Sequence, residues 1–146
     1  MAPIFFESVA LEDQHPSVSG KRILVVDDEK DQLEVIQQIL KKDFDVVTCN
    51  SGLAALEKLK RETFDLILCD VKMPGVDGVD IYNWIKNNRP EMTPKILFST
   101  GDVLGPKFEK VMREDKPAHI LKPYNIKCLQ SKVRSLLEAG RGQEPS

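Results

Sequence analysis

The chain has 146 residues, of which 41% are hydrophobic and 30% are charged, and its formal net charge at pH 7 is -2. This length suits one domain that buries its own core, and the balanced charge gives no electrostatic reason to expect binding to nucleic acid or to an anionic membrane. The three cysteines are widely spaced, and no apolar run approaches the roughly 20 residues of a membrane-spanning helix. We therefore expect a cytoplasmic protein without disulfides, a zinc site or a secretory leader.

The first 20 residues contain Pro3, Pro16 and Gly20 and show no sustained hydrophobic period. We interpret residues 1–20 as a flexible tail or linker. From residue 21 onward, short apolar runs alternate with longer amphipathic stretches. This alternation predicts five β-α units around a parallel sheet, over residues 21–139, followed by a polar tail at 140–146.

Five short apolar segments predict the strands, and the first, third and fourth are nearly continuous apolar runs, which is typical of strands covered on both faces. They are Arg22–Val26, Asp45–Cys49, Leu66–Asp70, Lys95–Ser99 and Ala118–Leu121. Apolar residues at helical spacing predict a helix after each strand. The expected buried faces are Leu33, Ile36 and Leu40; Leu53, Leu56 and Leu59 behind a cap at Ser51; Ile81, Trp84 and Ile85; Phe108, Val111 and Met112; and Ile126, Leu129, Val133, Leu136 and Leu137 before a stop at Gly140.

Parallel strands joined by right-handed crossovers place all their carboxyl ends at one edge of the sheet, where ligands bind. The strand ends here read "VVDDE", "LILCD", "FSTGD" and "ILKPY". They bring Asp27, Asp28, Asp70, Thr100 and Lys122 to that edge. Each residue also has an ordinary structural role, because acids favour helix starts, hydroxyls favour turns and a lysine at a strand end is usually solvated.

Taken together, these side chains suit a phosphoryl group. Asp27 and Asp28 offer the oxygen ligands that a hard ion such as Mg²⁺ prefers. Phosphoryl transfer depends on positioning and on charge neutralisation, to which the metal, Lys122 and Thr100 would contribute. A carboxylate can act as the nucleophile and form an aspartyl phosphate, and Asp70, centred among the others, is the candidate.

This constellation resembles the receiver domain of two-component response regulators over residues 21–139. The matching segments are "ILVVDDE", "LILCDVKMPGVDG", "STGD" and "LKPY", in the family's order. The resemblance implies a flavodoxin-like, doubly wound α/β fold of (βα)5 type with strand order 2-1-3-4-5. The "TGD" at residues 100–102 looks similar to receivers attached to hybrid histidine kinases.

If the resemblance holds, Asp70 accepts a phosphoryl group from a sensor histidine kinase or a histidine phosphotransfer protein. Asp27, Asp28, Asp70 and the backbone carbonyl of Lys72 would then bind Mg²⁺, or Mn²⁺ in its place. Lys72 flanks the site, and its effect on the lifetime of the phosphate is left open, as is a role as an ordinary solvated lysine.

The resemblance also implies a switch. Thr100 would bond a phosphoryl oxygen, Lys122 would pair with the phosphate, and the peptide bond between Lys122 and Pro123 would be cis. The family commonly has an aromatic switch residue three positions before the lysine, where this chain has His119. His119 either makes the output face respond to pH or is an ordinary half-exposed strand histidine.

Two other functions compete with a signalling receiver. A Mg²⁺-dependent aspartyl-phosphate phosphatase usually needs a second acid two residues after the nucleophile, where this chain has Lys72. A receiver-like module that binds without phosphorylation is the other alternative. The receiver hypothesis predicts a non-enzyme that acts on an unknown downstream effector, without binding nucleic acid or membrane itself, as a monomer or a phosphorylation-dependent dimer.

Overall fold

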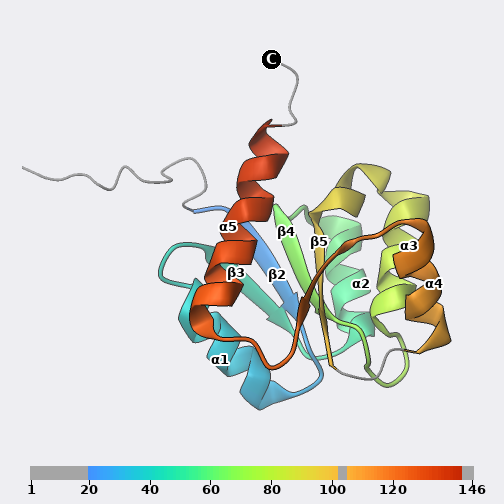
Figure 1. Cartoon of the computed structure of the whole chain (residues 1–146), viewed down its shortest axis with the longest axis horizontal. Coiled ribbons are helices and arrows are strands. Elements are labelled where there is room, and N and C mark those ends of the chain that lie inside the picture. Colours follow the sequence, from blue (N-terminus) through green and yellow to red (C-terminus); the bar gives the residue numbers. More distant parts are fainter. Residues whose placement is uncertain (1–19, 102–104, 143–146) are drawn as a thin grey trace, which may run out of the picture.

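The computed structural model describes residues 20–101 and 105–142, so the tail predicted at residues 1–20 lies outside the described residues except for Gly20. Five parallel strands form one sheet in the order β3-β2-β4-β5-β6 (Figure 1). Their bounds are Arg22–Val26 for β2, Asp45–Cys49 for β3, Leu66–Asp70 for β4, Ile96–Thr100 for β5 and Ala118–Leu121 for β6. Counted along the chain, this is the predicted order 2-1-3-4-5, and the flavodoxin-like fold is confirmed.

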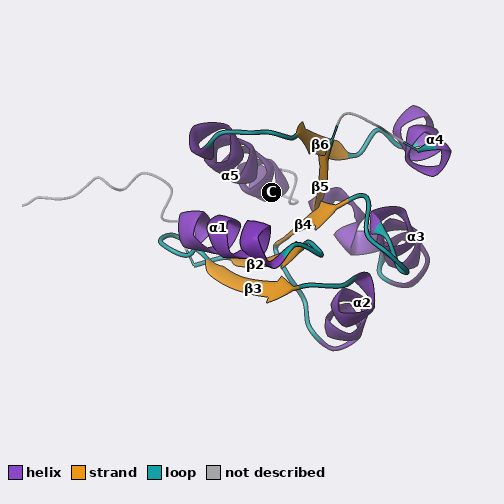
Figure 2. Ribbon diagram, turned by 90° about the horizontal axis from the view of Figure 1, so that it is seen from below, coloured by secondary structure: helices purple, strands orange, loops and turns teal. Residues whose placement is uncertain are grey.

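Helices cover both faces of the sheet. They are α1 (Lys30–Leu40), α2 (Gly52–Arg61), α3 (Gly78–Asn88), α4 (Pro106–Glu114) and α5 (Ile126–Gly142), with a 3-10 helix η1 at Pro90–Lys95. Figure 2 shows α1 and α5 on one face and α2 and α3 on the other. The buried side chains divide in the same way, into one cluster beneath α1 and α5 and a larger one beneath α2, α3 and α4. In the described part of the chain, no helix combines the length and the apolar character needed to cross a bilayer.

The buried face of α2 differs from the predicted one. Ser51 caps the helix as expected, because its hydroxyl accepts a hydrogen bond from the Ala54 amide at 3.1 Å. However, Leu53 is 62% exposed, and the buried side chains are Ala55 and Leu59. The reason is close approach, since a Cβ at Gly52 would lie 2.1 Å from the carbonyl oxygen of Val76. The small residues of α2, rather than its leucines alone, therefore face the segment around Val76.

Two predicted boundaries are also wrong. The predicted stop at Gly140 does not end α5, which continues to Gly142. A glycine inside a helix costs only about 1 kcal/mol relative to alanine, and no proline follows within the helix to reinforce it. The fourth strand starts at Ile96 and includes Thr100, because Lys95 belongs to the preceding 3-10 turn. Ile126, predicted on the buried face of α5, is exposed.

The short helix α4 is attached mainly to α3. Phe108 packs edge-on against Phe98 of β5, with ring centroids 5.1 Å apart. Lys107 reaches back to Asp77 and Asp80 at the start of α3, with Nζ–O distances of 3.1 Å to each carboxylate. Because α4 packs toward α3, it does not cover the side chains of β6 that face away from α5, and these are exposed.

The first residue of α3 should tolerate no side chain. A Cβ at Gly78 would lie 2.6 Å from the carbonyl oxygen of Asp70 and 2.9 Å from Cα of Val71. Since backbone atoms cannot yield as a flexible side chain does, we expect Gly78→Ala to lower the free energy of unfolding by about 1–3 kcal/mol in urea denaturation. Gly101→Ala, where a Cβ meets nothing within 4 Å, is the matched control. Equal stability of the two variants would contradict the steric explanation.

Candidate functional site

The carboxylates after β2 and β4 meet at one edge of the sheet. β2 and β4 are neighbouring parallel strands in which Val26 pairs with Cys69, so Asp27 and Asp70 follow at equivalent places. One carboxylate oxygen from each of Asp27, Asp28 and Asp70 lies within 4.8 Å of the other two. The geometry thus brings together the three acids that the sequence places at the strand ends.

The three acids differ in burial and in partners. Asp27 is only 2% exposed, Asp28 is exposed, and the Asp70 side chain is 12% exposed. One oxygen of Asp27, Oδ1, accepts a hydrogen bond from the Glu29 amide at 2.9 Å, which orients the carboxylate at the start of α1. Asp27 therefore also has the structural role that acids commonly have near a helix start.

Lys122 extends between two of these acids. Its Nζ is 3.5 Å from Oδ2 of Asp27 and 3.5 Å from Oδ1 of Asp70. The Lys122 amide donates to the carbonyl of Thr100 at 2.7 Å, and the peptide bond to Pro123 is cis, as the resemblance implied. Burial acts to lower the pKa of Lys122, but Asp70 and Asp27 outweigh it and the pKa is raised. The lysine therefore carries its charge at neutral pH.

Burial and neighbouring charges alter the acidity of Asp70. Burial raises the pKa of its carboxyl to about 6, with Lys122 opposing this shift and the negative charge of Asp27 adding to it. A carboxylate that is costly to ionise gains most from a further cation nearby. The electrostatics of the site thus favour a positive ion beside Asp70.

This environment predicts an unusual dependence of stability on pH without metal. An unfolded aspartate titrates near about 3.9, whereas folded Asp70 titrates at about 6. Between these values the folded protein binds the proton more tightly, so the stability contributed by Asp70 is present at low pH and is lost as the pH rises from about 4 to about 6. Allowing for solvent screening, we expect a loss of about 1–2 kcal/mol.

The measurement is urea denaturation of the metal-free protein between about pH 4 and pH 7, compared with Asp70→Asn. Other carboxyls titrate in the same range in both proteins, so the difference between the two curves isolates Asp70. Wild-type protein should lose stability relative to the variant as the pH rises. Parallel curves would show that Asp70 ionises without penalty.

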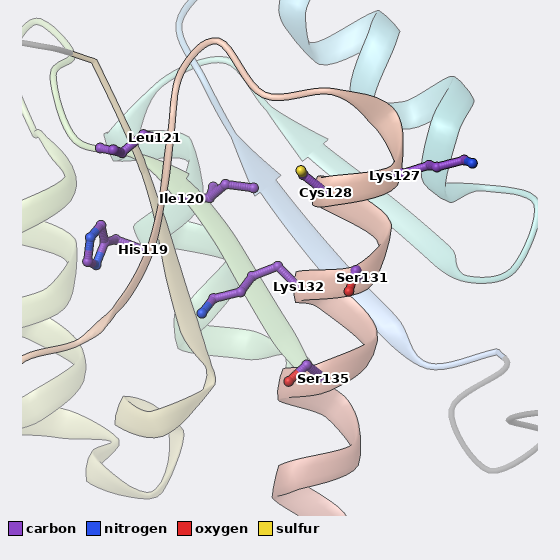
Figure 3. Close-up of a pocket in the computed structure, with 8 residues that line it drawn as sticks. All are labelled: His119, Ile120, Leu121, Lys127, Cys128, Ser131, Lys132 and Ser135. Carbon is purple, nitrogen blue, oxygen red and sulfur yellow. The ribbon is translucent and has the colours of Figure 1, made fainter.

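The other predicted site residues differ in burial and in position. Thr100 is buried at the end of β5, and its hydroxyl donates to the carbonyl of Gly101 at 3.3 Å. The Lys72 side chain is exposed. His119 is exposed on β6, and Figure 3 shows it on the side of the strand away from α5, with Ile120 on the side toward α5. His119 is thus outside the acidic centre.

Sequence reasoning gave no role to Tyr124, which follows the predicted lysine within "LKPY". Its hydroxyl oxygen is buried and has no hydrogen-bond partner among the described residues, and the same is true of the Ser99 hydroxyl. In the sequence, the only feature that could have pointed to Tyr124 was its place two residues after a predicted site lysine. Its significance depends on burial, which the sequence does not reveal.

The donor set suits a hard divalent cation. All three clustered ligands are carboxylate oxygens, which Mg²⁺ and Mn²⁺ accept in octahedral sites together with water or carbonyl oxygens. The cluster sets three carboxyl groups beside the single ammonium of Lys122, so a divalent cation would balance its charge. The residues therefore fit the metal that the strand-end acids suggested.

Comparison with known proteins agrees with this geometry. Residues 23–134 match the family model described as the response regulator receiver domain. The chain is 30% identical over 130 residues to the alkaline phosphatase synthesis transcriptional regulatory protein PhoP of Bacillus subtilis, covering 87% of this chain and 52% of that protein. It is 28% identical over 130 residues to histidine kinase P4 of Formosa agariphila, covering 88% of this chain and 9% of the kinase. The chain thus spans about half or less of these relatives.

Among solved structures, the CheY-like receiver domain protein of Methanospirillum hungatei JF-1 superimposes with a TM-score of 0.77 at 29% identity. That alignment covers 86% of this chain and 100% of the other. The match to the family model extends over most of the described residues and includes the acidic centre and all five strands except Arg22, the first residue of β2. The chain therefore belongs to the response regulator receiver domain family of two-component signalling systems.

Proposed function

We propose that this chain is a phospho-accepting receiver in which Asp70 takes a phosphoryl group from a histidine kinase or a histidine phosphotransfer protein. The observation that carries the proposal is the meeting of Asp27, Asp28 and Asp70 with the ammonium of Lys122 at the carboxyl edge of the sheet. A largely buried carboxylate beside a lysine ammonium suits nucleophilic attack on phosphorus, where positioning and charge neutralisation dominate.

In the proposed reaction, an ionised oxygen of Asp70 forms a bond to phosphorus while the bond from phosphorus to the imidazole nitrogen of the donor breaks. The imidazole leaves with the electron pair of that bond and takes up a proton. Lys122 already contacts one oxygen of Asp70 and would remain beside the new phosphate. Bound Mg²⁺ would neutralise charge on the phosphoryl oxygens, and Asp27, Asp28, Asp70 and the carbonyl of Lys72 would hold it.

A groove between α1 and the start of α5 offers a place for the phosphoryl donor. It is lined by apolar side chains that include Val35 and Ile126, each 55% exposed, together with Ile39. The same groove includes Tyr124 and Asn125, which follow Lys122 in the loop between β6 and α5. An amphipathic helix of a histidine kinase or phosphotransfer protein would bury these side chains and bring its histidine toward Asp70.

The response to phosphorylation would begin at Thr100. New acceptor oxygens on Asp70 would compete with the carbonyl of Gly101 for the Thr100 hydroxyl, which now bonds that carbonyl at 3.3 Å. Because the Lys122 amide donates a hydrogen bond to the Thr100 carbonyl, movement at either residue would be transmitted to β6 and the start of α5. His119 and Leu121 on β6 are exposed and would form part of the surface that a downstream effector contacts.

The competing phosphatase hypothesis is weaker. Two residues after the nucleophile, where such an enzyme has its general acid, this chain has Lys72 in place of a carboxylic acid. We propose that the chain catalyses at most its own phosphorylation and dephosphorylation.

The test is to incubate the chain with Mg²⁺ and acetyl phosphate and to measure its intact mass. We expect one added phosphoryl group, and no addition when EDTA replaces Mg²⁺. Peptide fragmentation should place the group at Asp70. Absence of any adduct in the wild-type chain would refute the proposal, while continuous release of phosphate from many phosphorylated substrates would support the phosphatase.

A further inference from the structure

Two buried hydroxyl groups beside the site have no hydrogen-bond partner among the described residues. They are Oγ of Ser99, a residue only 3% exposed, and the hydroxyl oxygen of Tyr124. A buried polar group without a partner is costly, and native structures contain few of them. Both groups therefore need a physical explanation.

Both hydroxyls belong to segments that carry site residues. Ser99 is the register partner of Asp70 on the neighbouring strand, so the two side chains extend from the same face of the sheet. Tyr124 follows Lys122 by two residues, in the loop between β6 and α5. That loop is tied to β5 by the hydrogen bond from the Lys122 amide to the Thr100 carbonyl.

The two side chains also extend from the same face of the sheet, because Ser99 follows Leu97 by two residues in β5 and Leu97 belongs to the core cluster against which Tyr124 packs. Burial raises the pKa of Tyr124, and the neighbouring Ser99 hydroxyl opposes this shift as a hydrogen-bonding group would. Lys122, Asp27 and Asp70 act on the same phenol, which places it within the electrostatic field of the acidic centre. Neither hydroxyl, however, has a hydrogen-bond partner among the described residues.

Packing alone does not explain the tyrosine. Its ring lies against the core cluster beneath α1 and α5, and phenylalanine would fill that space without burying an unpaired hydroxyl. The Ser99 hydroxyl likewise lies in a buried strand, where the three preceding residues, Ile96, Leu97 and Phe98, are apolar. The two residues can satisfy each other, because each hydroxyl can both donate and accept a hydrogen bond.

We propose that Ser99 and Tyr124 form a positioning pair that fixes the loop carrying Lys122 against the end of β5. A hydrogen bond between the two hydroxyls, closed by a small rotation, would add a side-chain connection to the backbone hydrogen bond from Lys122 to Thr100. The pair would then determine where the Lys122 ammonium stands between Asp27 and Asp70. The expected effect on the phosphorylation rate rests on the proposed function, whereas the expected effect on the position of Lys122 does not.

The first measurement does not require phosphorylation. In metal-free protein, the NMR signal of the Lys122 side-chain Cε methylene reports the surroundings of the ammonium. We expect this signal to shift in Tyr124→Phe and in Ser99→Ala, and to move no further in the double variant. Tyr82→Phe is the matched control, because Tyr82 is the other tyrosine of the chain and its hydroxyl bonds Asp115 between α3 and α4.

The second measurement is the rate of phosphorylation by acetyl phosphate at saturating Mg²⁺. Each single variant should lower the maximal rate about fivefold, the factor that corresponds to one neutral hydrogen bond. The concentration of acetyl phosphate at half-maximal rate should be unchanged. The double variant should be no slower than either single one, since both remove the same interaction. Ser99→Thr, which keeps the hydroxyl, should restore the rate.

The outcomes separate the two hypotheses. If wild-type protein takes up no phosphoryl group, the proposed function fails, and the Lys122 signal alone decides whether the pair positions the lysine. An unmoved Lys122 signal in Tyr124→Phe and Ser99→Ala would overturn the inference. Additive losses in rate, or losses equal to that in Tyr82→Phe, would also overturn it, because they would reflect stability rather than positioning.

Discussion

Replacing Asp70 by asparagine should abolish the phosphoryl adduct that the wild-type chain forms with acetyl phosphate and Mg²⁺. Asparagine has nearly the same shape, but its amide is a poor nucleophile and has no charge to hold a metal. We expect adduct formation, followed by intact mass, to fall by at least about a hundredfold. Loss of a nucleophile is the most severe change that the proposed mechanism allows.

The variant Asp45→Asn is the matched control. Asp45 is an exposed carboxylate at the amino end of β3, whereas the acidic centre lies at the carboxyl ends of the strands. Its Oδ2 pairs with Nε of Arg22 at 3.4 Å. It should form the adduct at the wild-type rate. Because removing the buried charge of Asp70 should not destabilise the fold, the loss in Asp70→Asn cannot be attributed to unfolding. A full adduct in Asp70→Asn would move the acceptor to another carboxylate.

Replacing Asp27 by asparagine should weaken Mg²⁺ binding about tenfold to a hundredfold. In the wild-type chain the Glu29 amide donates a hydrogen bond to Oδ1 of Asp27 at 2.9 Å. The side-chain oxygen of asparagine can still accept this hydrogen bond, so the start of α1 should be preserved. The loss of one negative charge removes a ligand of a hard cation and leaves Lys122 to neutralise a smaller cluster. Metal binding should therefore fall without loss of the fold.

The measurement is a titration with Mg²⁺, followed by the rise in melting temperature, since a ligand that binds only the folded state stabilises it by RT ln(1 + L/Kd), where L is the free ligand concentration. Phosphorylation should need correspondingly higher Mg²⁺ concentrations in Asp27→Asn. Asp45→Asn again serves as the control with one fewer acid. Unchanged Mg²⁺ dependence in Asp27→Asn would show that the metal binds without this carboxylate.

The strands were predictable because their sequence signal is local. A strand buried on both faces must be a short, nearly continuous apolar run, and Leu66–Asp70 and Arg22–Val26 satisfy this condition. The sheet order followed once the strand-end motifs resembled a known family. Helix faces were less predictable, as Leu53 shows, because leucines on two sides of α2 compete for burial and the tight contact of Gly52 with Val76 decides between them.

Helix ends and coverage of the sheet also depended on more than local pattern. Gly140 resembles a stop, but the cost of one glycine is small compared with the hydrogen bonds of a continuing helix. The exposure of His119 follows from the packing of α4 on α3, through Phe108 and Lys107. Such packing joins residues that are distant in the sequence, and no local pattern reports it.

The sequence by itself determined which side chains stand at the carboxyl ends of the strands, because apolar runs locate the strands and parallel connections align their ends. Only the tertiary structure decided how those side chains differ. Asp27 is buried and Asp28 is exposed although they are adjacent, and burial beside Asp27 raises the pKa of Asp70 to about 6. The unpaired hydroxyls of Ser99 and Tyr124 are likewise visible only in the folded chain. Desolvation and the distances between charges arise from contacts across the sheet, which exist only after folding.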